Sequence, residues 1–195
     1  MHRYLNVSIF EALERSTRKN GAALTALLTG FRYLFREDYS LELFSKIAPV
    51  DLIKPDSTTV IKQAELIAAN LKVKISGSVY FSKGWKLEET ENTRNWITLK
   101  NLLLEEGNFL ILHTETNIAP VMGFASFPFN HQSPCAGENR WVIICNPTPW
   151  HSASWIHSQH LSLSPPLHCV RLEVVRSELS ENAQNGIICL SRHCL

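Results

Sequence analysis

Cysteine and histidine side chains are the groups in this sequence that could attack a substrate or hold a metal ion. The chain contains five cysteines and eight histidines. Cys135 lies in a segment with proline, serine and glycine, and His131 precedes it by four positions. A thiol activated by an imidazole is a pair that nucleophilic catalysis uses. We expect Cys135 to be an ordinary loop cysteine, and we take it as the candidate nucleophile if the protein is an enzyme.

A second group of such residues could bind zinc. His151, His157 and His160 lie between Cys145 and Cys169 in the sequence, and zinc binds imidazole nitrogen and thiolate sulfur. The chain has neither a Cys-x-x-Cys pair nor a His-Glu-x-x-His motif, the spacings that place such ligands together. This favours a group of surface histidines, so we predict no metal site and no cofactor.

Composition narrows the class of protein. A length of 195 residues with 45% hydrophobic and 19% charged residues predicts one globular domain over residues 1–195. The formal net charge of +1 gives no reason to expect nucleic acid as a partner.

We expect no membrane insertion, because no apolar run approaches the roughly 20 residues of a membrane span. The cysteines are odd in number and irregularly spaced, and Glu11 and Glu14 interrupt any apolar signal segment. These features predict a cytoplasmic protein.

Apolar residues in the first half of the chain recur with the period of a helix. This spacing predicts a short helix over Leu5–Arg15 and a core helix over Asn20–Leu34. Ser40 is a good N-cap for a helix over 41–47. Further helices are predicted from Ser57 or Thr58 to Leu71 and around Trp96–Leu103, the latter ended by Gly107.

The second half of the chain is typical of strands. We predict strands, from short apolar or alternating runs, over 73–81, 109–112, 120–127, 141–145 and 169–174. Helices that come first and antiparallel strands that follow predict an α+β fold in which the helices pack against one sheet.

Three landmarks occur along the chain in a recognisable order. Asn20-Gly21-Ala22-Ala23-Leu24 opens the core helix, Leu102-Leu103 is followed by Gly107 and Phe109-Leu110-Ile111, and a later strand ends in Asn146-Pro147. This order resembles the papain-like peptidases that process bacteriocin leaders, the double-glycine peptidases found in front of some ABC exporters. The resemblance covers roughly residues 14 to 165. It implies a papain-like cysteine peptidase fold, with N-terminal helices packed on a C-terminal antiparallel sheet.

The resemblance also implies where catalytic residues should lie, and each position departs from the family pattern. The nucleophilic Cys position holds Asn20, and Glu14 occupies the place of the oxyanion-binding Gln. The His is expected at the start of the second strand, near Pro120, where residues 117–120 include no His. The Asp of the Asp-Pro pair is Asn146. An amide cannot attack a carbonyl, and a carboxylate would repel a developing oxyanion, so we predict that peptidase activity is lost.

A lost active site on a retained scaffold predicts recognition of a peptide or protein without cleavage. Catalytically inactive relatives in some type I exporters bind the passenger protein, which the resemblance offers as a precedent. We expect the partner to lie in the cleft between Asn20 and the strand at Pro120, with Trp150 and Trp155 as aromatic contacts. The alternatives are an active cysteine peptidase or transferase that uses Cys135, and a bacterial effector, or a peptide-maturation or secretion factor, that acts through a protein partner.

Overall fold

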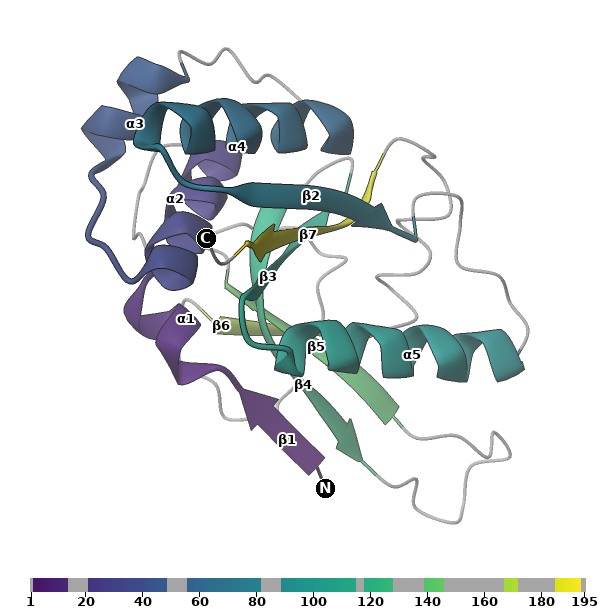
Figure 1. The fold of residues 1–195 in the computed structure, drawn as a ribbon. Helices are drawn as coiled ribbons and strands as arrows, with labels where there is room; N and C mark the ends of the chain where they lie inside the picture. The colour runs from purple at the N-terminus through teal and green to yellow at the C-terminus, as the bar shows by residue number, and fades with distance from the viewer. Residues whose placement is uncertain are drawn as a thin grey trace.

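The computed structural model describes residues 2–13, 21–48, 56–81, 89–114, 118–127, 139–145, 167–171 and 185–193. These residues form an α+β fold whose helices flank an antiparallel sheet (Figure 1). The helices are α1 (Val7–Glu11), α2 (Ala22–Phe35), α3 (Leu41–Ile47), α4 (Ser57–Leu71) and α5 (Glu89–Leu104). The strands are β1 (His2–Leu5), β2 (Ile75–Tyr80), β3 (Asn108–His113), β4 (Ile118–Phe127), β5 (Asn139–Cys145), β6 (Leu167–Arg171) and β7 (Gly186–Arg192). The α+β prediction is confirmed.

The sheet has the strand order β2-β7-β3-β4-β5-β6, and β1 also pairs with β4. Every described pairing is antiparallel. The C-terminal strand β7 lies between β2 and β3, and its residues from Gly186 to Leu190 are buried. A strand from the end of the chain therefore joins β2 to the rest of the sheet.

Helices cover both faces of the sheet. On one face, α2 and α4 bury Phe31, Leu27 and Val60 against strand residues such as Phe109. On the other face, α5 buries Trp96, Leu99 and Leu103. The Trp96 ring packs edge-on against Phe124, with 5.7 Å between the ring centroids. The helices thus pack against one sheet, with α5 on the face opposite to α2 and α4.

Close approach of α2 to the sheet depends on a glycine in the helix. A Cβ added at Gly30 would lie 2.6 Å from the nearest ring atom of Phe109. Phe109 is fully buried, so its ring has little space into which to retreat. Gly30 therefore lets α2 pack directly on β3, and α2 also contacts β4 and β7.

The predicted helix over Leu5–Arg15 is wrong at its start. Leu5 belongs to β1 and not to a helix, and the helix that follows is confined to Val7–Glu11. The side chain of Asn6 accepts a hydrogen bond from the Ile9 amide at 3.3 Å, which caps this short helix. β1 pairs with Gly123–Ser126 of β4, and this pairing is a tertiary interaction that helical periodicity does not reveal.

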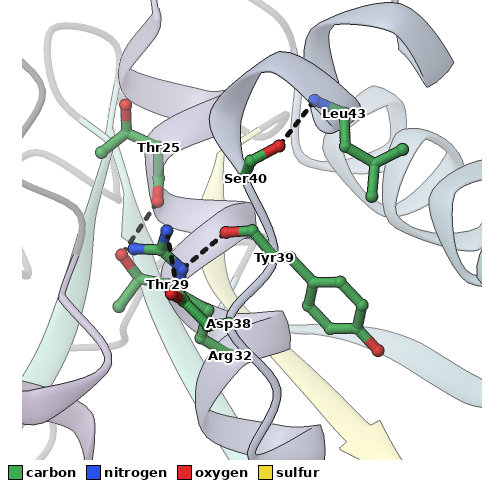
Figure 2. Close-up of polar contacts among 7 residues, drawn as sticks. All are labelled: Thr25, Thr29, Arg32, Asp38, Tyr39, Ser40 and Leu43. Carbon is green, nitrogen blue, oxygen red and sulfur yellow. Dashed lines mark hydrogen bonds and ion pairs between the residues drawn. The ribbon is translucent and has the colours of Figure 1, made fainter.

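The other helices follow their local signals. The Ser40 side chain accepts a hydrogen bond from the Leu43 amide at 3.2 Å, and α3 begins at Leu41 as expected (Figure 2). α4 runs from Ser57 to Leu71, with Asp56 as its N-cap. No helix among the described residues is long and apolar enough to cross a membrane.

Candidate functional site

Most of the residues predicted to form the site lie outside the described residues. These are Glu14, Asn20, Asn146, Trp150 and Trp155, together with the alternative nucleophile Cys135. Their predicted roles stay predictions. Pro120 is the one predicted site residue that lies among the described residues. For Asn20 and Asn146, the structure describes the elements next to them in the sequence, α2 and β5.

Pro120 is buried within β4 and pairs with Ile111 of β3. Its neighbours Ala119 and Val121 belong to the core on the α5 side of the sheet. Because side chains alternate along a strand, Pro120 faces the opposite side, which α2 covers. A proline there supplies neither a base nor a hydrogen-bond donor.

The strand register places the beginning of β4 beside the end of β5. Val121 of β4 pairs with Ile144 of β5, so the beginning of β4 lies beside the end of β5. β5 ends at Cys145, directly before Asn146 in the sequence. α2 packs on β4 over the same sheet. β4 is therefore in contact both with α2 and with β5.

An imidazole does lie at this end of the sheet, on the neighbouring strand. His113 is the last residue of β3 and pairs with Ile118, the first residue of β4. Its Nδ1 lies 2.9 Å from the Oγ of Ser57, the first residue of α4. The sequence analysis missed this pair, because Ser57 and His113 are 56 positions apart and belong to no local motif.

The acid beside this pair is Asp56. Its carboxylate accepts a hydrogen bond from the Thr59 amide at 2.6 Å and caps α4. Hydrogen bonds from Thr59 lower the pKa of Asp56, and the charge of His113 lowers it further. Serine, histidine and aspartate thus lie together at the point where α4 begins.

Burial decides what this cluster can do. The distance between Ser57 Oγ and His113 Nδ1 is one at which a base can activate a nucleophile. Ser57 is only 1% exposed and His113 only 2%, so a substrate carbonyl has no path to the hydroxyl oxygen. The hydrogen bond instead joins the start of α4 to the end of β3, and we assign it a structural role.

The described thiols are closed to solvent. Cys145 and Cys189 are both buried, and burial raises the pKa of the Cys189 thiol. Low reactivity is expected of such thiols, because the thiolate is the reactive form. Among the described residues, no three His, Cys, Asp or Glu side chains come close enough together to hold a metal ion.

An open cavity of about 820 Å³ lies at the C-terminal end of α2. It is lined by the start of the chain, by the segment after α2, by the turn from α5 into β3 and by Arg192. The sequence analysis did not identify it, because its walls come from four separate parts of the chain.

No protein-family model matches the sequence, and no curated protein matches it either. The papain-like resemblance consequently rests on the sequence landmarks.

Proposed function

We propose that this chain is a papain-like α+β domain without peptidase activity, and that it binds a peptide or protein partner in the cleft between the start of α2 and β4. The observation that carries the proposal is that β4, which contacts α2, pairs with the end of β5 through Val121 and Ile144. In the resembling family, the corresponding two strand ends carry the imidazole and the Asp-Pro pair.

Residue types at these positions support binding without cleavage. Asn20 has no nucleophilic atom, Glu14 would oppose negative charge on a substrate oxygen, and Asn146 is an uncharged amide. Pro120 fills the region of the expected base with a buried ring. The nearby imidazole of His113 is bonded to Ser57 within the core, so it cannot replace that base.

The proposed mode of binding is an extended segment that lies along the cleft. Its backbone groups would form hydrogen bonds with the chain, and aromatic side chains would contact its side chains. Trp150 and Trp155 follow Asn146-Pro147 in the sequence, which places them after the end of β5. We propose a cytoplasmic setting for this function and no role for nucleic acid or a cofactor.

The competing function is an enzyme whose nucleophile is Cys135, a peptidase or a transferase. A non-enzymatic effector, or a secretion or peptide-maturation factor, would use the same cleft for a protein partner. An activity probe that reacts with catalytic thiols separates the enzyme from the binding proteins, since we expect it to leave the native chain unlabelled at Cys135.

The binding proposal is tested by substitution of the cleft tryptophans. A peptide that binds the intact chain is first selected from a display library, and its Kd is then measured by calorimetry. Trp150→Ala and Trp155→Ala should each weaken binding by about 2–4 kcal/mol, or roughly 30- to 1000-fold in Kd. Leu66→Ala is the matched control, because Leu66 is an exposed apolar residue on α4. If both tryptophan variants keep their melting temperatures and bind as well as wild type, the cleft is not the recognition surface.

A further inference from the structure

The cavity at the C-terminal end of α2 has the size of a ligand site. Its volume of about 820 Å³ falls within the range of roughly 300–1,000 Å³ that is typical of such sites. It lies at the other end of α2 from the proposed cleft. Three arginines and four carboxylate residues line it, so the electrostatic character of the cavity depends on which of these groups are already paired.

The arginines are held by groups of the cavity's own walls. Arg32 donates from Nε to the Tyr39 carbonyl oxygen at 2.8 Å, and its Nη2 lies 3.1 Å from Asp38 (Figure 2). Arg192 donates to the carbonyl oxygen of Leu34 at 2.9 Å, at the end of α2. Arg36 lies 3.6 Å from Glu106. Arg32 and Arg36 thus pair with two of the carboxylates, whereas Arg192 bonds a neutral carbonyl and keeps its positive charge.

Two carboxylates remain without an ion pair to any described residue, those of Glu11 and Glu37. Both residues are exposed and line the cavity. Burial, together with a hydrogen bond to Glu37, raises the pKa of Tyr39 to about 12. The ends of α2 and α5 also meet the cavity, and the carbonyl end of a helix carries partial negative charge. With Arg192 counted as a positive charge, the side chains that line the cavity carry one net negative charge.

The inner wall offers a hydrogen-bond donor. Asn6 donates from its side-chain amide to the Tyr33 hydroxyl oxygen at 3.1 Å. The proton of the Tyr33 hydroxyl is then free to be donated to another acceptor, because a phenol both donates and accepts. Tyr4 lines the same wall, and burial together with nearby Tyr33 raises the pKa of Tyr4, so this phenol stays protonated. A peptide carbonyl is an acceptor that such hydroxyls can bind.

We propose that this cavity is a second binding site that takes a basic peptide segment. A lysine or arginine side chain would approach Glu11 and Glu37, while Tyr33 donates to a backbone carbonyl of the same segment. The exposed side chain of Leu104, which also lines the cavity, can pack against the aliphatic part of the basic residue. The inference rests on the proposed function in that it takes the partner to be a peptide.

The test uses three acetylated and amidated hexapeptides in which leucine alternates with lysine, glutamine or glutamate. Calorimetry on the full chain should detect binding of the lysine peptide, weaker binding of the glutamine peptide and none of the glutamate peptide. The protein's own net charge of +1 would not attract a cationic peptide, so such a preference has to come from a local site. Equal affinity for the lysine and glutamate peptides, or no binding of the lysine peptide, would overturn the proposal.

Substitutions locate the site. Glu11→Gln and Glu37→Gln should each raise the Kd of the lysine peptide by about two- to fivefold, the range expected for an exposed ion pair. Tyr33→Phe should raise the Kd of the lysine and glutamine peptides by equal factors, because it removes a hydrogen-bond donor to the peptide backbone. Glu65→Gln is the control, since Glu65 is exposed on α4 and does not line the cavity. A loss of the same size in the control would contradict the assignment. Since Trp150 and Trp155 are not among the residues that line the cavity, failure here and failure of the cleft proposal are distinguishable.

Discussion

Ser57 Oγ and His113 Nδ1 lie 2.9 Å apart in the core and join the first residue of α4 to the last residue of β3. A serine so close to an imidazole resembles a catalytic pair. With exposures of 1% and 2%, however, the two side chains are closed to substrates. The same contact holds α4 at the end of the sheet where the proposed cleft begins.

Ser57→Ala should therefore reduce stability and have no catalytic consequence. Removal of the hydroxyl takes away a buried partner of His113 Nδ1, and such a loss costs about 1–3 kcal/mol. Urea denaturation measures the difference in the free energy of unfolding. Thr58→Ala is the control, because Thr58 is exposed in the same helical turn. Equal stability of the two variants would show that the buried hydrogen bond contributes nothing.

Asp56→Ala should remove the N-cap of α4 at a cost of about 0.5–2 kcal/mol. The pKa of Asp56 is lowered from its ordinary value of 3.8, chiefly by hydrogen bonds from Thr59. A carboxyl whose pKa is lower in the folded state stabilises the protein above its unfolded pKa, and this stabilisation is lost as the pH falls through the folded pKa. The difference between wild type and Asp56→Ala should be full near neutral pH and should narrow below 3.8. A difference that grows on acidification would reverse the sign of this prediction.

Gly123→Ala should release β1 from the sheet. A Cβ at this position would overlap the backbone carbonyl oxygen of Tyr4, which cannot move without the strand. Overpacking of this kind costs about 1–3 kcal/mol. Hydrogen exchange reports the release directly, because the Asn6 amide donates to the Met122 oxygen at 2.8 Å and should lose protection. Gly77→Ala meets the side chain of Ile61 and should leave the Asn6 amide protected.

Thiol labelling tests the competing enzyme. Cys145 and Cys189 are buried, so both should react slowly in the native state and quickly in denaturant. In a variant that keeps Cys135 alone, the labelling rate should fall about tenfold for each pH unit below the ordinary thiol pKa of about 8.5. A rate that stays high in acid would mean a stabilised thiolate, and it would favour the enzyme.

The parts of the fold that the sequence predicted are those with local causes. α3 has its cap at Ser40, and α4 has a long apolar stripe, so both were placed within a residue of their observed bounds. β1 was missed because its pairing with β4 depends on a glycine more than 100 positions away. β7 was also missed. Its short apolar run near the C-terminus gives no sign that it lies between β2 and β3.

The candidate site was less predictable than the helices, because its residues are brought together by tertiary structure and not by local sequence. Apolar runs indicated the strands β4 and β5, whereas the predicted closeness of Asn20, Pro120 and Asn146 stays a prediction, because Asn20 and Asn146 lie outside the described residues. His113 was overlooked because the resemblance directed attention to residues 117–120 of the next strand. The walls of the cavity at the C-terminal end of α2 come from four separate parts of the chain, and only tertiary structure brings them together.

The central claim is that the chain binds peptides and leaves them intact, and one measurement addresses both halves of it. Immobilised wild-type protein is incubated with a peptide library, and the bound and unbound peptides are sequenced by mass spectrometry. We predict a set of enriched peptides of full length and no new termini in either fraction. Asn20→Cys should give the same result, because in the proposed papain-like arrangement the positions of the base and the oxyanion donor are also replaced. New peptide termini that appear with wild type and vanish with Cys135→Ala would contradict the account.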